Sequence, residues 1–196
     1  MKFMKLKNSG TAVKTSMVLM LSIALFSCGK EENDPKKDPV IEDDVVKVSQ
    51  NITGEVKWTS NKVYQLGGRI TVLSGATLTI EAGTVIKGEA GTGANATALL
   101  IARGAKLMAE GTAAKPIIFT SVADEITPAN VAAGNFASPN LEPDVNGLWG
   151  GVLILGKASI SASAAEVQIE GIPTSDQNGL YGGSDDADNS GVIKYI

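Results

Sequence analysis

One motif, Gly-Ala-x-Leu, recurs at a nearly constant spacing and constrains the fold of this chain more than any other feature. Its clear copies are Gly75-Ala76-Thr77-Leu78 and Gly104-Ala105-Lys106-Leu107, and Gly-Thr pairs at 83–84 and 111–112 follow them, all at a spacing of 28 to 29 residues. A weaker third copy spans residues 152–160, with Gly156 in the place of Gly104. Such a period is typical of stacked repeats, in which each unit buries its apolar face against its neighbours.

Each repeat unit contains short runs of β-branched residues with glycines between them. Apolar residues alternate within these runs, as in Ile70 and Val72 or Leu78 and Ile80, so one strand face points inward. The Asn ladder and the helical half of a leucine-rich repeat are missing, and a β-sandwich would not need a constant spacing. We therefore predict an all-β fold, a right-handed parallel β-helix. The expected strands are 70–73, 77–80, 85–87, 99–102, 117–121, 152–155 and 167–170.

The N-terminus has the features of an export signal. Lysines precede an apolar stretch at 17–26, which is too short to span a bilayer comfortably. The sequence Leu25-Phe26-Ser27-Cys28 then resembles the lipobox of bacterial lipoproteins. This resemblance implies that residues 1–27 are a signal peptide removed before Cys28, and that Cys28 carries a diacylglyceryl group and an N-terminal acyl chain. The alternative is an ordinary cleaved signal peptide with an incidental Cys, although Cys28 is the only cysteine.

The residues after Cys28 indicate a tether and a destination. Residues 28–47 are charged and contain two prolines, which is typical of a flexible linker. Within this tether, Lys30, Glu31 and Glu32 resemble the Lys-acid-acid export signal of some Gram-negative surface lipoproteins. That resemblance implies an outer-membrane protein that faces the outside of the cell. The alternative is that these are simply linker charges.

Residues 51–196 resemble a family of largely uncharacterised β-helical bacterial surface lipoproteins. The segments that carry the resemblance are Asn51-Ile52-Thr53-Gly54, LTIEAGTVIKG at 78–88, PIIFTS at 116–121 and GLWGGV at 147–152. The resemblance implies that residues 48–196 form the N-terminal coils of a parallel β-helix. It also implies further coils beyond Ile196, and hence a C-terminally truncated chain, because residues 190–196 have the pattern of a strand with no cap after it. It carries over no catalytic residues.

Composition excludes several classes of function. Residues 1–27 hold four lysines and no acid, so the remainder has 13 basic and 21 acidic residues and a formal charge of −8. Such a surface repels phosphate backbones, and nucleic acid is not an expected partner. The chain has no histidine, the commonest general base and metal ligand. A single cysteine also excludes an internal disulfide.

An acidic segment near the C-terminus is a candidate calcium site. Asp186, Asp188 and Ser190 alternate before Gly191, as the oxygen ligands do at the start of a calcium-binding loop. The bidentate acid expected at the twelfth position of such a loop would fall at residue 197. The alternative is an ordinary turn, which favours the same residue types. Ca²⁺ is the only cofactor that the sequence suggests.

A long insertion at about 122–147 interrupts the repeat and is rich in proline and acidic residues. Insertions of this length often bind or cover something. Together with Phe136, Trp149 and Tyr181, which could stack on sugars, it suggests a ligand surface on the long face of the solenoid. The alternative is a loop without a ligand, with Trp149 filling a corner of the core.

These features favour a membrane-anchored β-helix that acts as a non-catalytic binding or adhesion module for a glycan or another cell-surface ligand. A rival hypothesis is a polysaccharide lyase or hydrolase with its site in coils beyond Ile196. A third is a structural envelope protein without a ligand. We predict no catalytic residue within 1–196, because no acidic cluster recurs on one strand face and fold alone does not specify an activity.

Replacing Cys28 with Ala tests the lipid anchor. We expect the Cys28→Ala protein to leave the membrane fraction, because two or more acyl chains, at about 0.8 kcal/mol per buried CH₂, are what hold such a protein stably. The measurement is the intact mass and the membrane partition of both proteins. A variant that remains bound to the membrane contradicts the hypothesis.

Overall fold

The computed structural model describes residues 44–196. The predicted signal peptide, Cys28, the predicted export signal Lys30-Glu31-Glu32 and most of the predicted tether lie outside the described residues. Within the described part of the chain, no helix is long and apolar enough to cross a membrane.

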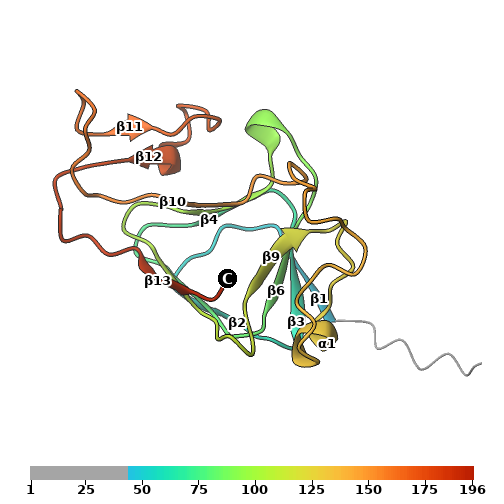
Figure 1. The fold of residues 1–196 in the computed structure, drawn as a ribbon. Helices are drawn as coiled ribbons and strands as arrows, with labels where there is room; N and C mark the ends of the chain where they lie inside the picture. Colours follow the sequence, from blue (N-terminus) through green and yellow to red (C-terminus); the bar gives the residue numbers. More distant parts are fainter. Residues whose placement is uncertain (1–43) are drawn as a thin grey trace, which may run out of the picture. The chain divides into compact units, whose positions relative to one another are not determined.

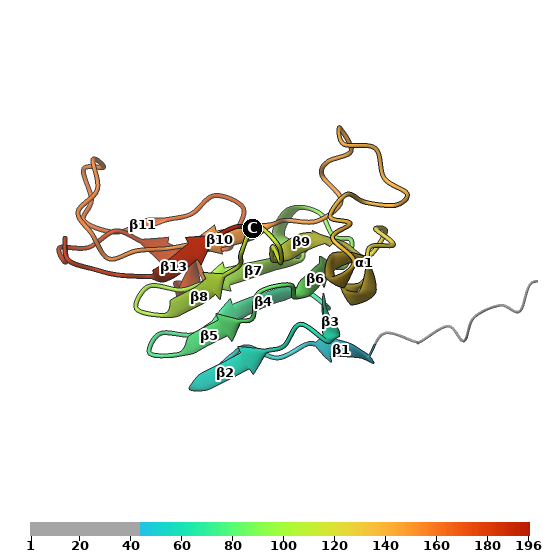
Figure 2. The same cartoon turned by 60° about the horizontal axis from the view of Figure 1, so that its bottom comes forward.

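Three parallel sheets stack their strands along one axis (Figures 1 and 2). Sheet A contains β1 (Asp44–Val48), β3 (Lys62–Leu66), β6 (Val85–Gly88) and β9 (Ile118–Ser121). Sheet B contains β4 (Arg69–Val72), β7 (Ala98–Ile101) and β10 (Val152–Ile154). Sheet C contains β2 (Glu55–Trp58), β5 (Thr77–Ile80), β8 (Lys106–Glu110) and β13 (Gly191–Lys194).

The chain visits sheets A, B and C in turn, so each circuit is one coil of a parallel β-helix. Coil 1 contains β1, an isolated bridge from Ile52 to Val72 in place of a sheet B strand, and β2. Coil 2 contains β3, β4 and β5, and coil 3 contains β6, β7 and β8. Coil 4 contains β9, β10 and β13. The predicted β-helix is thereby confirmed as an architecture of stacked parallel strands.

The strand register explains the repeated motif. Leu78 pairs with Leu107 between β5 and β8, and Ile70 pairs with Leu99 between β4 and β7, as the motif alignment predicts. The Gly-Thr alignment does not extend into sheet A, because a turn closed by the bridge between Thr112 and Lys115 lengthens coil 3.

The third copy of the motif is displaced. Val152 pairs with Leu99, and this register places Gly156 opposite Arg103. The predicted equivalence of Gly156 and Gly104 is therefore wrong by one residue.

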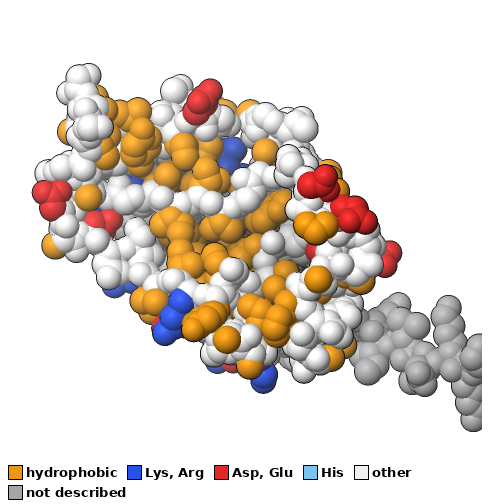
Figure 3. Space-filling view, viewed as in Figure 1, with side chains coloured by type: hydrophobic (Ala, Val, Ile, Leu, Met, Phe, Trp, Pro, Cys, Tyr) orange, Lys and Arg blue, Asp and Glu red, His pale blue; other side chains and the backbone are white. Residues whose placement is uncertain are grey.

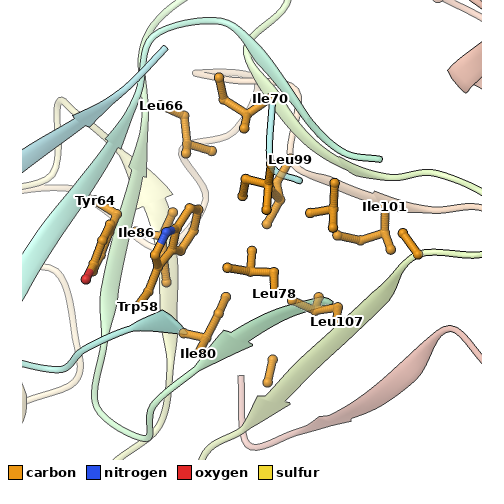
Figure 4. Packing of buried hydrophobic residues seen from close by; sticks show 14 of the residues in the cluster. Trp58, Tyr64, Leu66, Ile70, Leu78, Ile80, Ile86, Leu99, Ile101 and Leu107 are labelled. Carbon is orange, nitrogen blue, oxygen red and sulfur yellow. The ribbon is translucent and has the colours of Figure 1, made fainter. Parts of the chain in front are cut away.

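Inward-facing side chains form one continuous core through the coils (Figure 4). Leu66, Leu78 and Leu99 are completely buried. At the end of the core near coil 1, the Trp58 and Tyr64 rings stack with centroids 4.7 Å apart. Burying one such aliphatic side chain stabilises the fold by about 1.5–3 kcal/mol, and stacking gives every inner leucine neighbours from adjacent coils.

Two of the three sheets are covered on their outer face as well. On sheet A, Val63 and Val85 pack against Ile126 and Val131, the latter in the short helix α1 (Pro128–Ala132). The helix starts with a capping box between Thr127 and Asn130. On sheet B, Leu100 is buried beneath residues that follow β10. Sheet C has no such cover among the described residues, and its outer side chains are largely polar.

The face of coil 4 that points away from coil 3 carries exposed apolar side chains. Figure 3 shows hydrophobic side chains gathered in the middle of this face. The most exposed are Tyr195 and Ile196, at 58% and 59%. Val192, Ile193 and Ile154 are about two-fifths exposed, and all three belong to edge strands of coil 4.

Several predicted boundaries differ from the structure. Strand β1 begins at Asp44, inside the segment assigned to the tether, because the valines of 44–48 pair with β3 and Lys62 forms an ion pair with Asp44 at 3.1 Å. The expected strand at 167–170 is only β11 (Val167–Gln168), which pairs antiparallel with β12 (Leu180–Tyr181) and belongs to no coil. The other expected strands are present with shifts of one residue at most at each end. Strands β1, β2, β3, β8 and β12 were not among them.

A core leucine and its neighbour provide a test of this arrangement. We expect Leu107→Ala to lower the free energy of unfolding by about 2–5 kcal/mol, because Leu107 fills the interior between coils. Lys106→Ala, on the exposed outer face of the same strand, should change it by less than about 0.5 kcal/mol. Urea unfolding followed by circular dichroism measures both. Equal effects would contradict the inward and outward assignment of β8.

Candidate functional site

Residues 156–190 leave coil 4 after β10 and return at β13, and we call this excursion the lobe. Backbone and side-chain hydrogen bonds close its neck. The Lys157 amide donates to Asp188 Oδ2 at 2.7 Å, and the Ser159 amide donates to Asp186 Oδ1 at 2.8 Å. Gly182 N also donates to Gly156 O at 2.9 Å. The carboxylates of Asp186 and Asp188, two residues apart, therefore accept from the amides of Ser159 and Lys157, which are also two residues apart.

This neck contains the predicted calcium ligands. One carboxylate oxygen of Asp186 and one of Asp188 accept backbone hydrogen bonds, and the Ser190 carbonyl accepts from Leu107 N as part of the sheet C ladder. The hydrogen bonds from Ser159 lower the pKa of Asp186. Within residues 44–196, no group of three or more His, Cys, Asp or Glu side chains is placed to hold a metal ion. The contacts thus favour the alternative of an acidic turn.

The lobe packs on the outer face of sheet B. Leu100, Leu155 and Ile172 form a small apolar cluster, and Ile169 and Tyr181 pack against it. Leu100 points outward from β7, whereas its neighbours Leu99 and Ile101 point into the main core. Strand β7 is therefore buried on both faces, and the contacts of Leu100 attach the lobe to the solenoid.

Two arginine–carboxylate contacts add to this attachment. Arg103 Nη1 lies 2.6 Å from Glu166 Oε1 and donates to Gly182 O at 2.7 Å. Arg69 Nη2 lies 3.0 Å from Asp176 Oδ2. These are the only arginines in the sequence, and both join a turn or strand of the solenoid to the lobe. Because such contacts are charge-assisted, they favour one orientation of the lobe.

The two acids respond electrostatically to their partners. The hydrogen bond from Arg103 holds the pKa of Glu166 below its ordinary value. Partial burial alone would raise the pKa of Asp176, but hydrogen bonds from Asn178 and Arg69 outweigh burial and lower it. Both side chains are therefore carboxylates at neutral pH, and neither is suited to act as a general acid.

Between the lobe and the corner that joins sheets B and C lies a cavity of about 410 Å³, which we call the lobe cavity. The solenoid and the lobe contribute side chains of both charges, hydroxyls and amides to its wall. The lining residues are Ser74, Ala102, Arg103, Lys157, Glu166, Gln177, Asn178, Gly183, Ser184 and Asp185.

Lys157 is distinctive within this wall. Its ammonium crosses the turn at Gly104, where a Cβ atom would come within 2.6 Å of Nζ. Gly104 has a φ of +78°, a conformation that favours glycine in this turn. Among the described residues, no carboxylate lies within ion-pair distance of Lys157. Its charge is available to a bound molecule.

The three predicted stacking residues have separate surroundings. Trp149 packs against the main core and over Gly88, where a Cβ would meet the indole Cδ2 atom at 2.6 Å. This placement fits the alternative, in which Trp149 fills a corner of the core. Tyr181 lies beneath the lobe, and Phe136 is 36% exposed on the insertion. These contacts do not join Phe136, Trp149 and Tyr181 into one stacking surface.

Asp124 organises the insertion at 122–147. Asp124 is only 6% exposed, and its carboxylate accepts hydrogen bonds from Thr120 Oγ1, Ser138 Oγ and the Ile126 amide, at 2.8, 2.8 and 2.9 Å. A cavity of about 550 Å³ lies beside it. Because the Asp124 oxygens are used inside the insertion, this acid supports the loop structure.

Most residues of the lobe cavity were not singled out by sequence reasoning. They come from six separate segments of the chain, and single residues such as Ser74 or Asn178 have no motif around them. The one available signal was Arg103, because arginine is rare in this chain and this side chain lines the cavity.

The stacked parallel ladders define the chain as a parallel β-helix protein with a lobe on its fourth coil. Residues 50–134 and 136–196 match the family described as the pectate-lyase-like β-helix domain, and the chain belongs to this family. No curated protein and no solved structure is significantly similar to the chain. The family match supports the fold across both insertions and assigns no site residues.

The neck of the lobe gives a prediction about acid. A carboxylate with a lowered pKa in the folded state stabilises the fold above its unfolded pKa, about 3.9, and loses this effect as pH falls through the folded value. We therefore expect the protection of the Ser159 amide, its exchange rate relative to the intrinsic rate at the same pH, to fall below about pH 4 and, at neutral pH, in Asp186→Ala. Asp144→Ala, which removes an exposed carboxylate from the insertion, is the control. Unchanged exchange at Ser159 in Asp186→Ala would be the contrary result.

Proposed function

We propose that this protein is a non-catalytic carbohydrate-binding module and that the lobe cavity holds a sugar. The observation that carries the proposal is the unpaired Lys157 ammonium in a partly open, polar cavity of about 410 Å³. Cavities of about 300–1,000 Å³ are typical of small-molecule sites.

The chemistry of the wall suits a neutral, hydroxyl-rich ligand. A sugar hydroxyl both donates and accepts, and the wall offers the donor Lys157, the acceptor Asp185 and the hydroxyls of Ser74 and Ser184. The charges of Arg103, Lys157, Glu166 and Asp185 cancel formally, so the cavity has no excess of positive charge for a polyanion. These properties favour a neutral glycan.

The rival function is a polysaccharide lyase or hydrolase, which the family description favours. Within the lobe cavity, the contacts of Arg103 and Glu166 argue against it. Both terminal nitrogens of Arg103 contact Glu166 or Gly182, so this arginine is not poised as a base. The lowered pKa of Glu166 is the opposite of what a general acid needs. The rival hypothesis places its site in coils beyond Ile196, and release of oligosaccharides by the native protein would support it.

Location is part of the proposal. We propose that acyl chains on Cys28 anchor the protein in the outer membrane, and that the Lys30-Glu31-Glu32 signal directs it to the outer surface. A tethered solenoid in that position would present the lobe cavity to glycans of the medium or of neighbouring cells. A purely structural envelope protein, the third hypothesis, would bind no glycan.

Lys157→Gln tests the proposed site. We expect native protein to bind at least one of cellobiose, xylobiose, mannobiose and lactose in calorimetry, and Lys157→Gln to raise the Kd about tenfold. The reason is that a hydrogen bond to a charged group contributes about 1.5–3 kcal/mol, and 1.4 kcal/mol is a factor of ten. Unfolding temperature should hardly change, because Lys157 has no ion pair to lose.

The matched control is Lys106→Gln, an exposed lysine on the outer face of sheet C. It should bind these disaccharides as the native protein does. Binding that is equally weak in both variants, or absent from the native protein across the panel, would refute the lobe cavity as a neutral-glycan site.

A further inference from the structure

Asn178 lies on the wall of the lobe cavity and is held from behind by Asp176. Its backbone N–H and its side-chain Nδ2 both donate to Asp176 Oδ1, at 3.1 and 2.9 Å. The other carboxylate oxygen, Oδ2, accepts from Arg69 Nη2 at 3.0 Å. The carboxylate of Asp176 therefore joins the cavity residue to an arginine outside the cavity.

Arg69 belongs to the solenoid and not to the lobe. It starts strand β4, where it pairs with Ala98 of β7, and its Nη1 donates to Ala94 O at 3.1 Å. The ion pair is partly shielded, with the two side chains 20% and 25% exposed. Coil 2 is thereby connected through Asp176 to the cavity wall.

A carboxylate fixes the orientation of an amide beside it. Ionised Asp176 only accepts hydrogen bonds, so the Asn178 amide must turn its nitrogen toward Asp176 and keep its carbonyl oxygen for other partners. Gln177 has the same arrangement, because its Nε2 donates to Thr174 O at 3.2 Å. Both amides can then accept from a ligand hydroxyl.

We propose that Arg69 is a positioning residue that, through Asp176, fixes Asn178 as a hydrogen-bond acceptor for a sugar hydroxyl. The ligand part of this inference rests on the proposed function. Arg69 does not line the lobe cavity, and it acts by holding the Asp176 carboxylate in its orientation.

The loop that carries Asn178 has an independent support. Gln168 Nε2 lies 3.3 Å from the carbonyl oxygens of Ile172, Pro173 and Asp176. This support leaves the loop backbone in place when Arg69 is changed. The effect of Arg69 is therefore separable from folding of the loop.

The first experiment is a pH titration of the Asn178 side-chain amide by NMR, in the native full chain and in Arg69→Gln. Arg69 contacts Asp176, and Glu170 lines a small cavity together with Arg69. The charged side chains that line the lobe cavity with Asn178 are Arg103, Lys157, Glu166 and Asp185. We expect the Asn178 signal to follow Asp176, with a midpoint that rises in Arg69→Gln because the arginine favours the carboxylate. Lys57→Gln, which breaks the ion pair between β2 and Glu81, should leave this midpoint unchanged. An unchanged midpoint in Arg69→Gln would overturn the inference.

The second experiment measures selectivity in calorimetry. The probes are the best-bound disaccharide of the panel above and its singly deoxygenated analogues. Native protein should prefer the parent sugar over one analogue by at least about tenfold, and Arg69→Gln should reduce this ratio to about threefold or less. Asp176→Asn, which keeps the shape of the side chain and removes its charge, should have the same effect. A loss of stability alone would not change the ratio, so an unaltered ratio in both variants also overturns the inference.

The two proposals fail in different ways. If the native protein binds none of the four disaccharides, the proposed function is refuted, and the NMR titration still decides whether Arg69 positions Asn178. If binding is present and neither the midpoint nor the selectivity depends on Arg69, only the positioning role is refuted.

Discussion

The parallel hydrogen-bonded ladder between coils is the interaction on which the rest of this structure depends. A strand of three to five residues cannot bury its apolar side alone, and the ladder places equivalent side chains of successive coils above one another. Leu78 and Leu107 are such a pair, and both are almost completely buried. The lobe, the insertion and the wall of the lobe cavity all pack against residues whose positions this ladder fixes.

Apolar side chains on the outer faces of sheets A and B provide the sites at which extra segments attach to the solenoid. In sheet B the run Ala98–Ile101 is buried at every position, because odd and even residues meet different apolar partners. Leu99 and Ile101 complete the core, whereas Leu100 provides the anchor for the lobe. On sheet A, Val63 and Val85 provide the corresponding apolar contact for α1. Sheet C keeps polar residues on its outer face and carries no such segment in the described part of the chain.

The parts of the fold that the sequence predicted are those in which the local residue pattern agrees with the pairing between coils. Alternation and constant spacing predicted β5 completely and β4, β6, β7 and β9 within one residue, because local pattern and ladder agree there. Strand β1 was missed, since the charges of Asp44 and Lys47 hide valines that pair with β3. The alternate acids Asp186 and Asp188 resembled calcium ligands, but one oxygen of each accepts a hydrogen bond from a backbone N–H group of a segment distant in sequence. The lobe cavity could not be predicted, because long-range contacts alone bring Ser74, Lys157 and Asn178 together.

Leu107 pairs with Gly191 across both the insertion and the lobe, although the same leucine pairs with Leu78 of the adjacent preceding coil. The register between coils is therefore set by strand pairing and does not depend on the length of the segment that connects two strands at a corner. Loop closure entropy grows only slowly with length, so lengthening a corner costs little stability. Corners can thus diverge freely while strands keep their register, and related chains could share this scaffold with quite different cavities.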